Sequence, residues 1–207
     1  MTVLLINPNG SAAATAAMLA IARRHLARVA GWTNPAGPPM ITDAEGLARA
    51  GRQIAEADLP DADGLIVAAF GDPGAAALAA RHRAPVVGIG AAAARAASRG
   101  GAAFAVATTT PDLRGPINRL MAEAGAEGEF LGTFVTPGDP VALLGDPPAL
   151  DAALLRACTA AEAAGARRII IGGGPLASAA DRLSDQVSAD LVQPVPEACR
   201  ALAALLR

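Results

Sequence analysis

Short, continuous apolar runs alternate along the chain with longer runs that are rich in alanine, leucine and arginine. The short runs are typical of strands that a parallel sheet buries on both faces, and the longer runs have the length of helices. We expect strands at residues 3–6, 65–67, 86–89, 104–106, 169–171 and near 190–193. We expect helices at residues 11–30, 44–57, 73–82, 91–99, 112–124, 149–165, 175–187 and 195–206, with Asp43 and Asp112 as N-caps.

This alternation predicts an α/β protein with a mainly parallel sheet. An alanine-rich helical bundle is the alternative, but the β-branched triplets, each followed by Gly, Asn or Thr, count against it. Each half of the chain runs strand, polar turn, helix and later strand, Gly/Pro turn, helix. This weak repeat predicts two similar lobes, residues 1–91 with 191–207 and residues 92–190, whose four strand ends face one cleft. The segment 136–148, rich in proline and glycine, is the best candidate for a flexible rim loop.

Composition excludes several classes of function. The net charge of −2 offers no basic surplus for a nucleic-acid partner. All 17 residues counted as Lys or Arg are arginine, which excludes lysine Schiff bases, pyridoxal phosphate chemistry and the P-loop. We expect no cofactor and no metal, because neither the two histidines nor the two cysteines have the spacing of zinc ligands.

The hydrophobic fraction of 53% predicts a sizeable core and is compatible with a homo-oligomeric interface. The apolar start at residues 2–6 is too short for a signal peptide, and charges interrupt the alanine-rich stretch that follows it. Cys158 and Cys199 lie inside helical patterns, so we interpret them as small buried residues with reduced thiols. We therefore expect a soluble cytoplasmic protein with no membrane contact.

Four polar or glycine-rich turns follow expected strands, where the first N–H groups of a helix suit a carboxylate or another polar ligand. Each turn is also typical of ordinary local structure, namely a helix N-cap at Asn9 or Ser11, a plain βα loop or a threonine-rich strand exit. The turns are residues 7–11, 69–74, 108–110 and 172–175. The candidate substrate-binding residues within them are Asn9, Ser11, Phe70, Gly71, Thr108, Thr109 and Gly174.

Two aspartates are weak candidates for a general base. Asp72 stands in a Gly-Asp-Pro-Gly turn, where an aspartate more often bonds to its own backbone. Asp181 lies in an expected helix, and nothing in the sequence distinguishes it further. His25 and His82 both stand beside arginines, so we expect them to be solvated.

Taken together, the motifs resemble one family. Ile6-Asn7-Pro8-Asn9, Phe70-Gly71-Asp72-Pro73-Gly74, residues 85–89 and residues 108–110 occur in the order found in the aspartate/glutamate/hydantoin racemase superfamily, nearest its hydantoin and allantoin racemase branch. The resemblance covers nearly the whole chain. It implies two flavodoxin-like lobes related by pseudo-twofold symmetry, with a cofactor-free active site in the cleft between them.

The resemblance also implies where the catalytic groups should stand. In that family two cysteines on opposite faces of the substrate remove and return a proton beside a carbonyl group, while backbone N–H groups hold the developing enolate oxygen. The matching positions here are Ala69 and Gly173, so this chain lacks both thiols. A glutamate common in the family would fall near position 91, where this chain has Ala91. Pro175 has no backbone N–H, so the second turn has one donor fewer.

Two hypotheses follow from the sequence. The first is a cofactor-independent protein of the racemase/isomerase superfamily whose pocket takes a small carboxylate or cyclic amide, and for which two-thiol racemisation is not supported. The alternative is a non-catalytic binding or regulatory protein, or a divergent lyase or decarboxylase with a base other than cysteine. A carboxylate or histidine at the centre of the cleft would favour an enzyme, whereas only alanine, glycine and threonine there would favour a binding protein.

Overall fold

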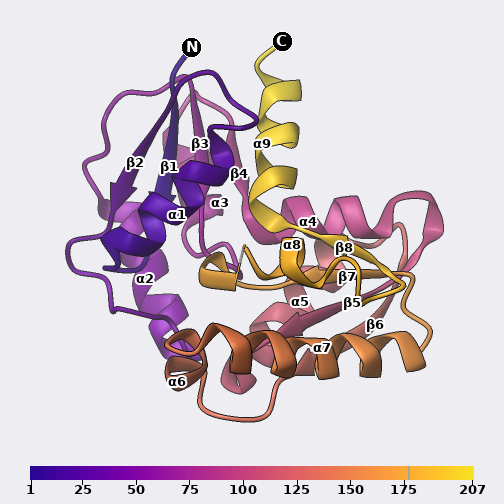
Figure 1. Ribbon diagram of the computed structural model, residues 1–207. Coiled ribbons are helices and arrows are strands. Elements are labelled where there is room, and N and C mark those ends of the chain that lie inside the picture. Colours follow the sequence, from indigo (N-terminus) through magenta and orange to yellow (C-terminus); the bar gives the residue numbers. More distant parts are fainter. Residues whose placement is uncertain (177) are drawn as a thin grey trace.

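The computed structural model describes residues 1–176 and 178–207, which form two four-stranded parallel sheets (Figure 1). The strands are β1 (Val3–Asn7), β2 (Val29–Thr33), β3 (Gly64–Val67), β4 (Val86–Gly88), β5 (Ala103–Thr108), β6 (Glu129–Val135), β7 (Arg168–Ile171) and β8 (Asp190–Val192). The strand orders are β2-β1-β3-β4 and β6-β5-β7-β8. The second order repeats the first with every strand four places later, so the predicted two-lobe α/β fold is confirmed.

Helices connect the strands in both lobes. They are α1 (Ala12–Ala22), α2 (Ala44–Glu56), α3 (Ala75–Arg81), α4 (Ile89–Ser98), α5 (Arg114–Ala124), α6 (Pro140–Leu144), α7 (Pro147–Ala163), α8 (Ala179–Leu183) and α9 (Pro194–Leu205). Short 3₁₀ turns occur at Arg99–Gly101, Pro111–Leu113 and Gly174–Leu176. The Asp43 carboxylate accepts the Gly46 N–H at 2.7 Å, which confirms this N-cap. The prediction for Asp112 was wrong, because this residue lies inside a 3₁₀ turn and α5 begins at Arg114.

Each sheet is buried between two layers of helices. In the first sheet, α1 and α9 cover the face of Val3 and Leu5, while α2 and α3 cover the face of Leu4 and Ile6. In the second sheet, α7 and α8 cover the face of Ala105, Ile169 and Ile171, with α7 running along its length (Figure 1). Helices α4 and α5 cover the opposite face, so the buried strands have the continuous apolar runs of a parallel sheet.

Two of the four edge strands, β2 and β6, were not predicted. The expected helix 11–30 ends at Ala22, and residues 29–33 instead pair in parallel with β1. Residues 136–148 are not a plain loop, since they contain α6 and the start of α7, which the side chains of Asp139 and Asp146 cap. The expected helix 175–187 is a 3₁₀ turn followed by α8, and residue 177 within it lies outside the described residues.

The expected lobe boundaries fall inside two elements. The boundary at 91/92 divides α4, whose Ala92 packs on the first sheet while Ala93 and Ala97 pack on the second. The boundary at 190/191 divides β8, which pairs with β7 and so belongs to the second sheet. Helix α9 returns to the first lobe, where Val195 and Leu202 contribute to the core. Across residues 1–176 and 178–207, no helix combines the length and apolarity needed to cross a membrane.

Candidate functional site

The ends of the four inner strands meet at one cavity. The loops after β1, β3, β5 and β7 all line it, so each lobe contributes two strand ends, as the repeat predicted. The space open to the centre of a water molecule is about 40 Å³, which is room for about three waters or for a small ligand. The lining residues are Asn9, Met40, Ile41, Ala68, Ala69, Phe70, Thr108, Thr109, Thr110, Leu113, Gly172, Gly173, Gly174 and Leu176.

Asn9 supplies the polar group on the side of β1. The side chain of Asn7 holds this loop, because its Oδ1 accepts the Asn9 N–H at 3.0 Å and its Nδ2 donates to Ser11 and Thr15. Asn9 itself is only 6% exposed, and its Oδ1 has no hydrogen-bond partner among the described residues. A buried acceptor without a partner costs about 1–3 kcal/mol, so this oxygen is suited to a donor on a ligand.

Threonines supply the polar groups on the side of β5. The Thr108 hydroxyl donates to the Gly172 carbonyl at 2.7 Å and thereby ties the loop after β5 to the loop after β7. Thr110 lies 3.4 Å from Thr108, oxygen to oxygen. The Thr109 hydroxyl makes no hydrogen bond to the described residues, although the residue is 1% exposed. Thr109 therefore has both a donor and an acceptor to offer to a ligand.

The glycine turn after β7 forms the opposite wall. A Cβ at Gly172 would lie 2.7 Å from a ring carbon of Phe70, so the close approach of this ring requires glycine. Gly173 has a φ of +154°, a backbone conformation that other residues rarely adopt. A Cβ there would also lie 3.1 Å from the side chain of Leu176.

The structure brings together most, but not all, of the candidate residues. Four of them do not line the cavity. Ser11 caps α1 by accepting the Ala14 N–H at 3.2 Å, and Gly71 shapes its turn with a φ of +109°. Asp181 is exposed on α8, where it accepts a hydrogen bond from Gln193. Both Asp72 oxygens are already bonded to backbone N–H groups of α4, so its carboxylate is not presented to the cavity as a base.

An apolar wall of the cavity was not predicted. It consists of Met40 and Ile41, from the loop after β2, together with Leu113 and Leu176. Met40 and Ile41 could not be predicted, because β2 was not predicted and the loop after it was therefore not recognised as a strand end. Leu113 and Leu176 end short 3₁₀ turns that the sequence pattern merged with helices.

The comparisons with known proteins agree with this geometry. Residues 3–202 match the family model described as Asp/Glu/Hydantoin racemase. The chain belongs to the Asp/Glu/hydantoin racemase family. It is 30% identical over 216 residues to the hydantoin racemase of Paenarthrobacter aurescens, covering 100% of this chain and 91% of that protein. Among solved structures, allantoin racemase from Pseudomonas fluorescens superposes with a TM-score of 0.90 at 25% identity, covering 100% and 91% of the two chains. For allantoin racemase from Klebsiella pneumoniae the TM-score is 0.83 at 28% identity, with 100% and 87% covered.

The two positions that the racemase resemblance assigns to cysteines both line the cavity. Ala69 follows β3 of the first sheet and Gly173 follows β7 of the second, so they approach the cavity from different lobes. Within the described part of the chain, the lining contains no Asp, Glu, His, Cys or Arg. The polar side chains that face the cavity are therefore amide and hydroxyl groups, none of which ionises near neutral pH.

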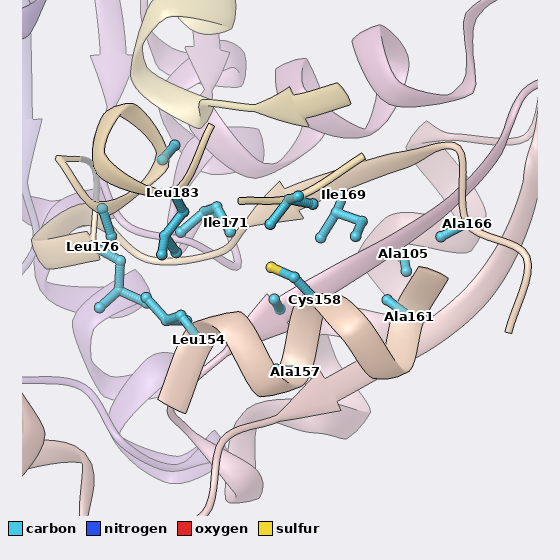
Figure 2. Packing of buried hydrophobic residues seen from close by; sticks show 14 of the residues in the cluster. Ala105, Leu154, Ala157, Cys158, Ala161, Ala166, Ile169, Ile171, Leu176 and Leu183 are labelled. Carbon is cyan, nitrogen blue, oxygen red and sulfur yellow. The ribbon is translucent and has the colours of Figure 1, made fainter. Parts of the chain in front are cut away.

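The cysteines that this racemase-family chain does have are remote from the cavity. Cys158 on α7 and Cys199 on α9 are each 0% exposed, and Cys158 packs in one apolar cluster with Ile169 and Ala105 of the second sheet (Figure 2). Burial raises the pKa of the Cys158 thiol to about 11 and that of Cys199 to about 12. Both thiols thus stay protonated at neutral pH, and the prediction that they are small buried residues is confirmed.

We expect the native protein to react with Ellman's reagent at pH 8 at least about 100 times more slowly than the unfolded chain, which should show two thiols. At that pH only about one Cys158 in a thousand is a thiolate, and both sulfurs are enclosed by apolar side chains. Stopped-flow absorbance measures the rate, with the protein in guanidinium chloride as the control. Rapid labelling of either thiol in the native state would contradict this placement.

Proposed function

We propose that this family member binds a small, uncharged cyclic amide of the hydantoin type in the cavity between its lobes, without two-thiol racemisation. The unpartnered oxygen of Asn9 carries the proposal, since it needs a donor from the ligand. A cyclic amide offers both N–H donors and C=O acceptors, whereas a carboxylate offers acceptors only. The lining, within the described residues, also holds no cation to offset the burial of a carboxylate.

The remaining groups of the lining fit the same ligand. The Thr109 hydroxyl can donate to a ring carbonyl, and Phe70, Ile41 and Leu176 give the ring an apolar surface. Membership of the family and the 30% identity to a protein named hydantoin racemase support a cyclic amide over other polar ligands. A lyase or decarboxylase with a different base gains no support, because the carboxylates of Asp72 and Asp181 are engaged elsewhere.

A ligand panel tests this proposal. Hydantoin and 5-methylhydantoin should raise the melting temperature by mass action, whereas aspartate, glutamate and succinate should not. In isothermal titration, Thr109→Val should weaken hydantoin binding about 5- to 10-fold, because it removes one hydrogen bond without changing the side-chain shape. Thr159→Val, on the exposed side of α7, is the matched control and should bind like the wild type. Stabilisation by the dicarboxylates alone would contradict the proposal.

A further inference from the structure

We infer that Asp72 is a positioning residue, whose carboxylate fastens the turn that carries Ala69 and Phe70 to the first turn of α4, and that ligand affinity depends on this attachment. The inference rests on the proposed function for its ligand, but the attachment itself can be tested without one. Asp72 does not line the cavity, whereas Ala69 and Phe70 do. Its contribution is therefore to hold residues that would touch the ligand.

The carboxylate takes the place of a helix N-cap. Asp72 Oδ1 accepts the N–H of Gly90 and Oδ2 accepts the N–H of Ala91, both at 2.7 Å. These N–H groups belong to the first turn of α4, where no preceding carbonyl can accept from them. The N-cap residue Gly88 has no side chain to do so. An aspartate 18 and 19 residues earlier in the sequence thus completes the helix start.

The surroundings are shaped around this carboxyl group. A Cβ at Gly88 would lie 2.1 Å from Asp72 Cγ, and a Cβ at Gly90 would lie 3.1 Å from Oδ1. Asp72 also has a φ of +51°, and among the described residues it is the one non-glycine residue with a positive φ. That conformation costs roughly 1 kcal/mol or more, which two charge-assisted hydrogen bonds can offset. The side chain is held at the expense of local backbone strain.

The same turn connects the cavity to the contact between the lobes. The Asp72 N–H donates to the Ala69 carbonyl at 3.0 Å and closes the turn. Phe70 lines the cavity and also packs in one apolar cluster with Ala93 of α4 and Phe104 of β5. Release of the carboxylate from α4 would therefore displace the wall of the cavity formed by Ala69 and Phe70.

Protonation provides a way to weaken the attachment. Burial raises the pKa of Asp72 from 3.8 to about 6, although the Ala91 and Gly90 N–H groups and the positive charge of Arg95, also on α4, act in the opposite direction. Once protonated, one oxygen carries a hydrogen and no longer accepts well from the N–H that it faces. Affinity for the cavity ligand should thus fall as the pH falls through about 6.

The stability of the ligand-free protein should change in the opposite direction. Because the pKa in the folded state lies above that in the unfolded state, the folded protein binds the proton more tightly. The stability due to this group is present in full below pH 3.8 and is lost as the pH rises through about 6. The melting temperature of the wild type relative to Asp72→Asn should therefore rise between pH 8 and pH 5, while ligand affinity falls.

The experiment compares the wild type, Asp72→Asn and the control Asp181→Asn between pH 5 and pH 8, with hydantoin as the probe. In isothermal titration the wild type and the control should lose about tenfold in affinity from pH 7.5 to pH 5. Asp72→Asn, with one acceptor oxygen in place of two, should bind about tenfold more weakly at pH 7.5 and show a flat profile. An equal pH dependence in Asp72→Asn would overturn the inference.

Amide NMR of the ligand-free protein separates this inference from the proposed function. In the wild type, the resonances of Gly90, Ala91, Ala69 and Phe70 should titrate together with a midpoint near pH 6, and in Asp72→Asn they should not titrate. If hydantoin fails to bind while these resonances still titrate together, the proposed ligand is wrong and the attachment stands. If Gly90 and Ala91 titrate but Ala69 and Phe70 do not, Asp72 caps α4 without positioning the cavity wall, and the inference fails.

Discussion

The double variant Ala69→Cys/Gly173→Cys is expected to exchange the C5 proton of 5-methylhydantoin for deuterium at least about 100-fold faster than the wild-type protein. A positioned acid or base typically contributes about 10²–10⁴ in rate, and the wild type has no ionisable group at either position. Both positions line the cavity from different lobes, so one thiolate could take the proton while the other thiol returns a deuteron. Proton NMR in deuterium oxide measures the loss of the C5 signal.

Backbone strain at Gly173 limits the expected increase in the exchange rate. Its φ of +154° and the 3.1 Å approach to Leu176 mean that any side chain there strains the turn. Ala69→Ser/Gly173→Ser is the matched control, since it has the same strain without a thiol and should exchange no faster than the wild type. If the wild type exchanged rapidly and iodoacetamide blocked that exchange, a native thiol would have to act on the ligand in the cavity. Exchange by none of the three proteins would count against a hydantoin as the ligand.

Gly88→Ala is expected to destabilise the protein by about 3 kcal/mol, at the upper end of the cost of overpacking. Gly88 has an ordinary extended backbone, so alanine introduces no dihedral strain. The new Cβ would instead lie 2.1 Å from the carboxyl carbon of Asp72, which two hydrogen bonds hold in place. Urea denaturation gives the free energy of unfolding. Gly115→Ala, in α5 with nothing within 4 Å of the added Cβ, is the control and should be neutral or slightly stabilising.

A second substitution shows whether the Asp72 carboxylate causes the destabilisation expected for Gly88→Ala. In an Asp72→Ala background the space beside Gly88 is vacated, so the further cost of Gly88→Ala should fall below about 1 kcal/mol. The difference between the two costs is the coupling energy of the pair in a double-mutant cycle. Equal costs in both backgrounds would show that Gly88 is glycine for a reason unrelated to Asp72.

The inner strands could be predicted from the sequence because burial on both faces leaves a simple signal. Residues 169–171 and 3–6 are continuous apolar runs, and both are strands in the structure. Two of the four edge strands, β2 and β6, have no such signal. β2 contains Ala30 and Gly31, which are exposed, and β6 is only half buried, with Gly132 at a positive φ. Such strands follow from pairing with a neighbour, which local composition does not report.

The candidate site was predictable to the extent that it follows from strand ends. Asn9, Thr108 and Gly173 each lie within two residues of the end of an inner strand, and topology alone brings them together. The bonds of Asp72 could not be found in this way, because its partners Gly90 and Ala91 are backbone groups in a different element. Gly88 and Gly90 give no signal of these bonds in the sequence, since glycines at a strand end also occur in ordinary turns that hold no distant side chain.

The position of α9 has a consequence for the order in which the protein is completed during synthesis. The helices that cover the second sheet, α4, α5, α7 and α8, all precede α9 in the chain, so that lobe can close before α9 leaves the ribosome. The first lobe cannot, because Val195 and Leu202 of α9 cover the strand face that carries Val3 and Leu5. The part of that apolar face which α9 covers stays open to solvent, and to chaperones, throughout the synthesis of the second lobe. The lobe that is made first is therefore the one that is finished last.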